Sequence, residues 1–554
     1  MVTVKKIPIG RDNFKDIIEK GYYYVDKTKI IEDILEIGAY VTLFPRPRRF
    51  GKSLMISTMD EFFNAEKKEE NKNLFKGLYI DKSKYKNEQG KYPIIKLNLK
   101  SVEASNWEET YSGIKEIIRQ LYESKRYVME ILNEEEKELY RQFLLKKADL
   151  SEYKLSLKLL SQYLYKYYKE KVIILIDEYD VPIQKGYLKG FYTQIVDFIK
   201  ALFNNALKTN ENIELARITG VLRVSKESIF SDLNNVKIYS TVNTAYDEYF
   251  GFTEEETKKL LEYYNLELTP EVKQMYNGYI FGNQQIYNPW SIINYASDKT
   301  LLPYWINTSG NELLQQIFDK TQEETKEMIE KLVLGESIAC KYNDKVTFLD
   351  LNNIETDEAK DTVANFLLVS GYLTKTKESN LVEQDGYLTL KIPNQDVRTI
   401  YKDVIAKWIG RQGKVSSQKI YELHQALISN DKIKIEKILN ETLNYMSFYD
   451  SQENFYHGYM LGLFVRFLNS KYIVKSNREA GRGRFDIMIE SVDRKIGIVV
   501  EFKVAGENEN VEEKAQKGKE QIVDKEYYKE LELDRVENIL TYAVAFKGKE
   551  CKVR

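Results

Sequence analysis

A short segment that ends in Gly-Lys-Ser carries the clearest chemical signal of this chain. Residues 46–53 read Arg-Pro-Arg-Arg-Phe-Gly-Lys-Ser and follow the apolar run 39–44. A strand, a tight loop and a helix N-terminus form a phosphate site, because backbone N–H groups and the helix dipole attract anions. In such a site Lys52 reaches the β- and γ-phosphates, and the Ser53 hydroxyl binds Mg²⁺. The general pattern has glycine where this chain has Arg46. The motif alone therefore leaves nucleotide binding open.

A second apolar run ends in two carboxylates. Residues 172–176 are Val-Ile-Ile-Leu-Ile, as expected of a strand buried on both faces of a parallel sheet, and Asp177 and Glu178 follow. In P-loop NTPases the first acid after such a strand holds Mg²⁺, and a following Glu can orient the attacking water. A surface turn gives the same pattern. The two acids favour a nucleotide site mainly because they occur together with the loop at 46–53.

A third element follows the next apolar strand, which we predict at residues 213–221. Thr219 near the end of that strand can sense a γ-phosphate, and Arg223 just beyond it can stabilise charge in the transition state. The alternative is that Arg217 and Arg223 are ordinary surface charges.

Several motifs together resemble those of the bacterial AAA-ATPase-like family, which is related to the STAND-type signalling NTPases. These are the loop at 46–53, Leu-Ile-Asp-Glu-Tyr-Asp at 175–180, Ile-Thr-Gly-Val at 218–221, Tyr-Asn-Gly-Tyr at 276–279 and Tyr-Asn-Pro-Trp at 287–290. In that family the loop commonly begins Arg-Pro-Arg, which accounts for Arg46. The resemblance is strongest over residues 5–310 and implies that the chain binds ATP with Mg²⁺.

The resemblance also implies roles for individual residues. Glu178 and Arg223 are expected to act in catalysis, and Ser53 and Asp177 to bind Mg²⁺. The expected nucleotide-binding residues are Arg46, Arg48, Arg49, Phe50, Gly51, Lys52, Ser53, Leu54 and Asp177. The signature Val-Asp-Lys-Thr at 25–28 also matches the family, near the adenine or at an oligomer contact. A homo-oligomer, in which Arg223 or a loop arginine serves a neighbouring subunit, stays open.

The last hundred or so residues carry a second set of carboxylates. Asp486 precedes the apolar run 487–489, and a strand at 496–500 leads to Glu501 and Lys503. Because side chains alternate along a strand, Glu501 and Lys503 point to the same side, and in a hairpin Asp486 lies near Glu501. Two such carboxylates can hold Mg²⁺ or Mn²⁺, and a nearby lysine can position or help deprotonate the attacking water.

This arrangement resembles the PD-(D/E)xK nuclease superfamily. The resemblance makes Asp486 and Glu501 metal-binding and catalytic residues, with Lys503 and Gln521 as further catalytic residues and Glu453 as an additional acid. Basic residues near the motif support a nucleic-acid partner: Lys471, Lys475, Arg478, Arg482 and Arg484. A solvated charged turn is the alternative for these charges, and a degenerate nuclease is the alternative for the whole set.

Composition narrows the class of protein. The 83 Lys and Arg residues against 85 Asp and Glu residues give a net charge of -2, which argues against a wholly basic nucleic-acid binder. Two cysteines and two histidines exclude a disulfide framework, a Cys-based zinc site and a multi-histidine metal site. Because no run approaches the ~20 apolar residues that span a bilayer, we expect a cytoplasmic protein without a membrane partner.

Strands alternate with helices over residues 7–251, which predicts an α/β fold. We expect a P-loop NTPase parallel sheet with helices on both faces, a helical middle region and a smaller C-terminal α/β restriction-endonuclease-like domain. The predicted parts are an ATPase domain (1–252), a helical lid (253–350), a mainly helical connector (351–445) and a nuclease-like domain (446–554). The function that follows is an ATPase that regulates a Mg²⁺-dependent nuclease, in defence or mobile-element biology. The alternative is a nucleotide-controlled signalling or scaffold protein with an inactive nuclease-like domain.

Overall fold

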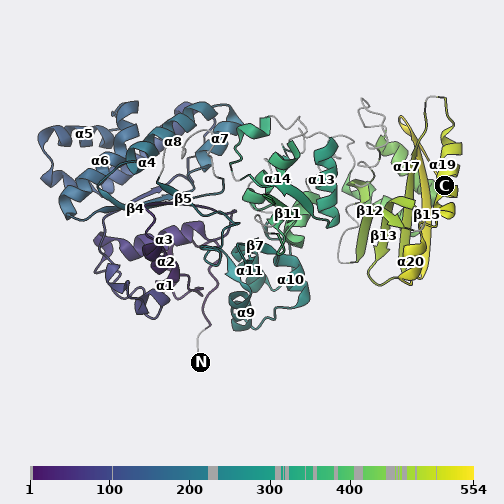
Figure 1. Cartoon of the computed structure of the whole chain (residues 1–554), viewed down its shortest axis with the longest axis horizontal. Helices are drawn as coiled ribbons and strands as arrows, with labels where there is room; N and C mark the ends of the chain where they lie inside the picture. Colours follow the sequence, from purple (N-terminus) through teal and green to yellow (C-terminus); the bar gives the residue numbers. More distant parts are fainter. Residues whose placement is uncertain are drawn as a thin grey trace. The chain divides into compact units, whose positions relative to one another are not determined.

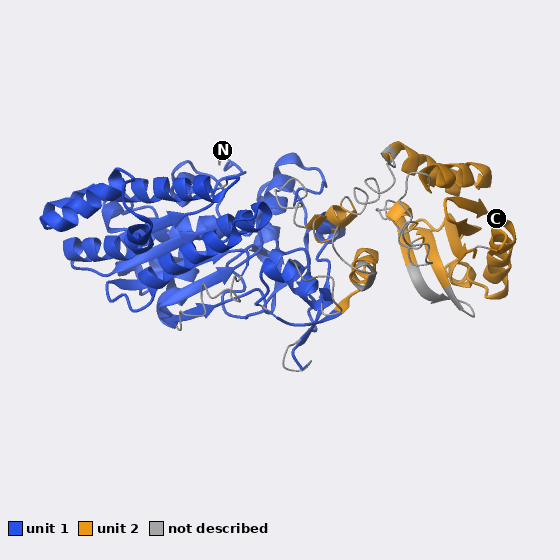
Figure 2. Cartoon of the chain, turned by 90° about the horizontal axis from the view of Figure 1, so that it is seen from above, with its two compact units in different colours: residues 1–307, 339–397 blue, residues 308–338, 398–554 orange. Residues whose placement is uncertain are grey.

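The computed structural model has two compact units, formed by residues 1–307 with 339–397 and by residues 308–338 with 398–554 (Figure 2). The structure describes the following residues: 4–102, 104–222, 235–305, 314, 315, 317, 323–343, 345–352, 359–379, 385–402, 404, 416–443, 456, 460, 462–464, 471–480, 483–506 and 508–554. The loop at 46–53 belongs to the first unit, and Asp486 and Glu501 belong to the second.

A five-stranded parallel sheet forms the centre of the first unit (Figure 1). Its order is β2-β3-β4-β1-β5, with β1 (Val41–Pro45), β2 (Ile94–Asn98), β3 (Val172–Asp177), β4 (Ile213–Gly220) and β5 (Val236–Ile238). Strands β1 and β3 are buried throughout, which explains their apolar sequences. Strand β4 lies between them, so the carboxyl ends of all three meet at one edge. The edge strand β5 was not predicted, because it is short and only partly buried.

Helices cover both faces of this sheet, as predicted (Figure 1). One face packs against α3 (Lys52–Phe63), and the other packs against α4 (Trp107–Ser124) and α6 (Leu150–Tyr168). Further helices in this region are α1 (Phe14–Glu19), α2 (Lys29–Ile37), α5 (Glu134–Leu144), α7 (Val181–Lys189), α8 (Tyr192–Leu207), and the 3₁₀ turns η1 (Ala65–Lys67), η2 (Tyr79–Lys82), η3 (Lys86–Glu88) and η4 (Arg126–Ile131).

The rest of the first unit combines the predicted helices with two small sheets. The helices are α9 (Glu254–Tyr263), α10 (Pro270–Tyr276), α11 (Pro289–Asp298), η6 (Leu349–Asn352) and α14 (Ala359–Ser370). One sheet has the order β6-β8-β7, from β6 (Phe252–Thr253), β7 (Tyr279–Phe281) and β8 (Gln284–Tyr287). The other has the order β10-β11-β9, from β9 (Ile338–Lys341), β10 (Thr374–Lys375) and β11 (Tyr387–Lys391). Strands this short leave too little alternation in the sequence to be predicted.

The second unit contains a mixed five-stranded sheet in the order β12-β13-β14-β15-β16. Its strands are β12 (Tyr472–Ala480), β13 (Gly483–Ser491), β14 (Ile496–Val504), β15 (Asn538–Lys547) and β16 (Glu550–Val553). Strands β14 and β15 run parallel and the other neighbours are antiparallel. The helices are α13 (Glu323–Leu334), α16 (Ser417–Ile428), α17 (Lys432–Leu443), α19 (Val511–Asp524) and α20 (Lys529–Leu533). Most of the predicted helix at 451–468 lies outside the described residues.

Among the described residues, no helix combines the length and the apolar character needed to cross a membrane. Both cysteines, Cys340 and Cys551, are buried and free.

Candidate functional site

The loop at 46–51 connects β1 to α3 at the carboxyl edge of the parallel sheet. Gly51 precedes α3 with φ +85°, a left-handed conformation that glycine adopts without strain. Arg49 also has a positive φ, of 69°. Since glycine cannot cap the helix with a side chain, the first-turn N–H groups around Ser53 and Leu54 can meet a phosphate.

Lys52 is buried beneath this loop. Its Nζ donates hydrogen bonds to the Arg46 carbonyl at 3.0 Å and to the Pro47 carbonyl at 2.9 Å. Burial lowers the pKa of Lys52, and the carboxylates that follow β3 act in the opposite direction. The loop's own carbonyls therefore hold the ammonium, and phosphate oxygens can take their place.

Two acids at the end of β3 lie beside β4. Asp177 is buried and accepts a hydrogen bond of 2.6 Å from the Thr219 hydroxyl on β4. Glu178 has φ 51°, and burial raises its pKa, while Lys52 opposes the rise. The Asp177 carboxylate and the Ser53 hydroxyl are hard oxygen donors of the kind that Mg²⁺ prefers, so these residues fit the predicted ion.

Asp180 is a further polar residue of this site that the sequence analysis did not assign. Its Oδ2 accepts from the backbone N–H groups of Val221 at 2.8 Å and Leu222 at 2.9 Å, and burial raises its pKa. A Cβ at Gly220 would lie 2.6 Å from the Tyr179 ring and 2.8 Å from Asp180 Oδ1. The glycine of the Ile-Thr-Gly motif therefore lets the end of β4 approach the turn that carries the acids.

The three arginines of the loop have different surroundings. Arg46 is fully buried, and its guanidinium donates to three backbone carbonyls and lies over an aromatic ring. Burial lowers the pKa of Arg46 to about 9. Its side chain is thus used in packing, which leaves only its backbone for the predicted nucleotide contact. Arg48 donates to Gln184 on α7 at 2.8 Å. Arg49 is exposed, with its guanidinium carbon 4.2 Å from the centre of the Trp290 ring.

Phe50, a predicted nucleotide-binding residue, and Arg217, which was given as a surface charge in the alternative, both lie inside the protein. The Phe50 ring is buried and packs edge-on against Tyr279 with ring centres 4.9 Å apart. Arg217 is not a surface charge: it is buried on β4, donates to the Ala39 carbonyl at 3.0 Å, and has its pKa lowered to about 10 by burial. Arg223 lies outside the described residues.

A turn after α14 contacts the phosphate loop from the side. Gly371 has φ +86°, and a Cβ on it would lie 2.5 Å from Pro47 Cβ. The Tyr279 hydroxyl donates to the Gly371 carbonyl at 2.9 Å. Since Tyr279 also packs on Phe50, this turn and the loop share one well-packed environment.

A second candidate site lies in the second unit, between β13 and β14. The antiparallel register that pairs Ile487 with Val500 places Asp486 opposite Glu501. Glu501 is buried, and its Oε1 accepts from Lys503 Nζ at 2.7 Å. The hairpin therefore brings the two acids and the lysine together, in the arrangement that the sequence predicted.

Helix α19 covers this face of β14. Gln521 Nε2 donates to Glu501 Oε1 at 2.7 Å and to the Tyr527 hydroxyl at 2.8 Å. A Cβ at Gly518 would lie 3.3 Å from Lys503 Cγ, so glycine allows the helix to approach the strand closely. Tyr527 was not predicted, since a tyrosine after the helix carries no motif of its own.

The second carboxylate oxygen of Glu501, Oε2, is buried and lacks a hydrogen-bond partner among the described residues. Burial, followed by the charge of Asp486, raises the pKa of Glu501 to about 7. Two neighbouring carboxylates, one with a buried, unpartnered oxygen, are the protein ligands that Mg²⁺ commonly takes, with water and substrate oxygens completing its coordination. These residues therefore fit the predicted Mg²⁺ or Mn²⁺.

Comparison with known proteins agrees with both halves of this description. Residues 8–230 match the family model described as predicted AAA-ATPase. Residues 451–554 match the PD-(D/E)XK nuclease superfamily. The chain therefore carries one segment similar to each of these two families. A protein from Azotobacter chroococcum mcd 1, described as an uncharacterized protein in the vnfD 5′ region, is 25% identical over 433 residues, which cover 77% of this chain and 75% of the relative.

The basic residues of the nuclease-superfamily segment are only partly described. Lys475 forms ion pairs with Glu490 at 3.4 Å and with Glu530 at 2.6 Å. Its charge is therefore matched by acids, and we withdraw it from the predicted nucleic-acid contacts. Lys471 is exposed. The side chains of Arg478 and Arg484, and the residues Arg482 and Glu453, lie outside what the structure describes.

The tyrosines of the motifs at 276–279 and 287–290 lie in the core of the first unit. Tyr276, Tyr279 and Tyr287 are buried. Gly278 has φ +127°, and a Cβ there would lie 1.9 Å from the Pro393 carbonyl oxygen. The glycine and the tyrosines of these motifs are therefore required by packing.

The Val-Asp-Lys-Thr signature at 25–28 is bound within the first unit. Asp26 accepts from the backbone N–H groups of Thr28 at 2.9 Å and Tyr79 at 2.7 Å. Lys27 pairs with Glu256 at 2.6 Å. These bonds tie the start of α2 to η2 and α9, and a role at the adenine or in an oligomer stays a prediction.

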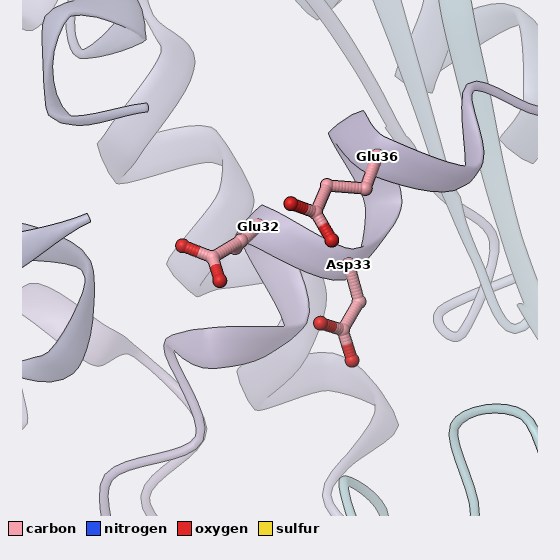
Figure 3. Close-up of side chains that lie close together, drawn as sticks. All are labelled: Glu32, Asp33 and Glu36. Atoms are coloured by element: carbon pink, nitrogen blue, oxygen red, sulfur yellow. The ribbon is translucent and has the colours of Figure 1, made fainter. Parts of the chain in front are cut away.

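An acidic group on α2 is formed by Glu32, Asp33 and Glu36 (Figure 3). Each of these carboxylates has a partner from another element. The partners of Glu32, Asp33 and Glu36 are, in that order, Ser83, Tyr249 and Lys84. These bonds hold α2 to neighbouring segments, so we assign the group no ligand.

We predict that Gly371→Ala weakens ATP binding several-fold more than Gly386→Ala. Both glycines have a positive φ, of +86° and +84°, so alanine strains the backbone by about 1 kcal/mol in each. Only at residue 371 does the added Cβ collide with Pro47, whereas nothing lies within 4 Å of a Cβ at residue 386. Calorimetric titration with ATP and thermal melts of both variants test this. Equal losses in the two would show that the contact with the loop is unimportant.

We predict that Tyr527→Phe lowers nuclease activity about tenfold, because Gln521 loses one of the two partners that orient its amide. Loss of this hydrogen bond also destabilises the fold by about 1 kcal/mol. The control is Tyr528→Phe, which alters the adjacent, partly buried ring at the edge of the same core. Plasmid cleavage rates with Mn²⁺ measure the effect, and unchanged rates in Tyr527→Phe would contradict it.

Proposed function

We propose that the AAA-ATPase segment binds and hydrolyses ATP with Mg²⁺, and that it thereby regulates a metal-dependent nuclease in the C-terminal segment, acting in defence or mobile-element biology. The observation that carries the first part is the meeting of Lys52, Asp177 and Glu178 at the carboxyl edge of the sheet, next to the N-terminus of α3. The second part rests on the cluster of Asp486, Glu501 and their partners.

Each residue of the first site has a definite task in this proposal. Lys52 exchanges the two loop carbonyls for β- and γ-phosphate oxygens. Ser53 and Asp177 hold Mg²⁺, which neutralises phosphate charge when bound, and Thr219 keeps the Asp177 carboxylate in place. Glu178 orients the attacking water, and the raised pKa of this partly buried acid suits proton acceptance from it.

In the second site Asp486 and Glu501 hold a divalent cation, which polarises the scissile phosphodiester when bound. Lys503 lies against Glu501 and can position or help deprotonate the attacking water. Gln521 fixes the Glu501 oxygen that it shares with Lys503. An intact set of this kind favours an active nuclease over a degenerate one.

Regulation is supported by the contact between Gly371 and Pro47. The segment 339–397 packs on the phosphate loop within the first unit and then continues along the chain into the second unit at residue 398. A change at the loop on nucleotide binding therefore acts on the segment that leads to the nuclease.

The test is incubation of the purified chain with plasmid and Mg²⁺ or Mn²⁺, with and without ATP. We expect cleavage that ATP changes at least fivefold in the wild type, no cleavage by Glu501→Ala, and cleavage insensitive to ATP in Lys52→Ala. Cleavage that survives Glu501→Ala would remove the nuclease assignment. Hydrolysis by Lys52→Ala at the wild-type rate would remove the ATPase assignment. Binding of nucleotide without any cleavage would favour the signalling or scaffold protein.

A further inference from the structure

Arg49 is the loop arginine whose side chain is exposed next to the predicted phosphate site. Arg46 is buried against backbone carbonyls, and Arg48 bonds to Gln184. Arg49 lies three residues before Lys52 in a left-handed backbone conformation, with φ 69°. A non-glycine residue in this conformation is uncommon, and such residues often occur where a loop holds a functional geometry.

The Arg49 guanidinium rests on a rigid platform. Its central carbon lies 4.2 Å from the centre of the Trp290 ring, which is a cation–π contact. Trp290 is itself fixed, because its Nε1 donates to the Tyr304 carbonyl at 3.1 Å and its backbone N–H donates to the Asn288 side chain at 2.9 Å. The carbonyl of Trp290 accepts from Asn294 at 2.7 Å. A planar guanidinium on such a ring loses little further freedom when it binds an anion.

We propose that Arg49 is a catalytic residue that contacts the terminal phosphate of a bound nucleoside triphosphate, and that Trp290 is its positioning residue. This rests on the proposed ATPase function. Glu178, which follows β3, is among the charges that act on Arg49. A guanidinium in that position stabilises the negative charge that builds on the terminal phosphoryl group. The arginine is supplied by the same chain.

The proposal assigns Trp290 a task beyond packing. The Asn-Pro-Trp motif forms the start of α11, with Asn288 as its N-cap, and its Trp290 ring contacts the Arg49 side chain of the phosphate loop. When Arg49 binds a terminal phosphate from this platform, its charge is partly neutralised, and the environment of the Trp290 indole changes. Because a diphosphate lacks that phosphoryl group, it leaves the environment of the indole unchanged.

The experiment measures binding of ADP and of a non-hydrolysable ATP analogue to the full chain, so that it does not depend on hydrolysis. We expect Arg49→Ala to weaken the analogue at least tenfold and ADP less than twofold. Trp290→Leu should reduce the preference for the analogue over ADP about threefold and lower kcat about tenfold. Trp290→Phe should retain most of the preference and most of the kcat, because a phenylalanine ring can still form a cation–π contact. Arg141→Ala and Trp107→Phe, which alter residues on α5 and α4, are the controls.

Tryptophan fluorescence provides an independent readout. The analogue, but not ADP, should change the emission of the wild type, and the change should be lost in both Arg49→Ala and Trp290→Phe. The proposal would be overturned if Arg49→Ala kept the wild-type preference for the analogue over ADP, or if it weakened the binding of both nucleotides equally. Thermal melts and the Arg49→Lys variant report whether the loop is intact. If Lys52→Ala binds and hydrolyses ATP as the wild type does, the proposed ATPase function fails instead. If Lys52→Ala loses ATP binding or hydrolysis while Arg49→Ala behaves as the wild type, only the role of Arg49 fails.

Discussion

Replacement of Lys52 by methionine is expected to lower ATP hydrolysis at least a hundredfold while leaving the fold intact. The ammonium is buried, and its removal deletes the charge that faces Asp177, Glu178 and the incoming phosphates. Two hydrogen bonds to loop carbonyls are lost, at about 1 kcal/mol each. The substitution also removes a desolvated cation, so we expect the free energy of unfolding to change by no more than about 1 kcal/mol.

Phosphate release and thermal melts of the same samples separate these two effects. Lys189→Met is the matched control, because Lys189 is exposed in the last turn of α7. Its hydrolysis rate should equal that of the wild type. A Lys52→Met protein that hydrolyses ATP within threefold of the wild-type rate would contradict the assignment of Lys52, and one that unfolds would show that its carbonyl contacts hold the loop together.

The strands predicted most accurately from the sequence are those that are buried on both faces. Strands β1 and β3 are buried on both faces, so their sequences are continuously apolar and their positions were predicted closely. Strand β12 was missed because it is an edge strand of polar sequence, with Lys475 and Arg478 among its residues. Its charged residues were interpreted as support for a nucleic-acid partner, with a solvated turn as the alternative, whereas the pairing of β12 with β13 comes from backbone hydrogen bonds.

Some contacts of the two sites could be predicted from the sequence, and others could not. The meeting of Asp486 with Glu501 follows from side-chain alternation and the hairpin register, both of which can be worked out from the sequence. The contacts of Tyr527 and Asp180 depend on how distant segments pack, which no local pattern encodes. The role of Arg46 was obscured for the same reason, because its partners are carbonyls from other parts of the fold.

Packing also explains how the phosphate loop does without the first glycine of the general motif. Glycine-rich loops obtain their shape from backbone freedom, which a nucleotide must then restrict. Here Arg46 and Phe50 anchor both ends of the loop in the core, and Pro47 lies against the turn at Gly371. A loop held in this way loses less conformational entropy on binding. Arg46, Phe50 and Pro47 therefore hold the loop in its binding conformation before the nucleotide arrives. Pro47 also packs the loop against the turn at Gly371.

Removal of the Glu501 charge is expected to stabilise the metal-free protein and to abolish its response to metal. Glu501 is buried beside Asp486, and its pKa is raised to about 7 from an ordinary value of 4.5. Between these two pH values the folded state holds a proton that the unfolded state has lost. Stability without metal therefore falls as pH rises from 4.5 through 7, by up to about 3 kcal/mol. In Glu501→Gln this fall should be absent.

A bound divalent cation has the opposite effect on stability, because it interacts favourably with the charged carboxylates. At a hundredfold excess over its dissociation constant, the cation stabilises the wild type by about 2.7 kcal/mol. Melts at pH 8 with EDTA, Mg²⁺ or Mn²⁺ should thus show a metal-dependent rise in Tm that Glu501→Gln lacks, while Glu513→Gln, which alters an exposed acid on α19, keeps it. Metal that raises the Tm of Glu501→Gln as much as that of the wild type would place the cation elsewhere. Burial and the neighbouring Asp486 charge raise the pKa of Glu501 although Lys503 pairs with it. A cation bound to both carboxylates would relieve the geometry that destabilises the metal-free protein.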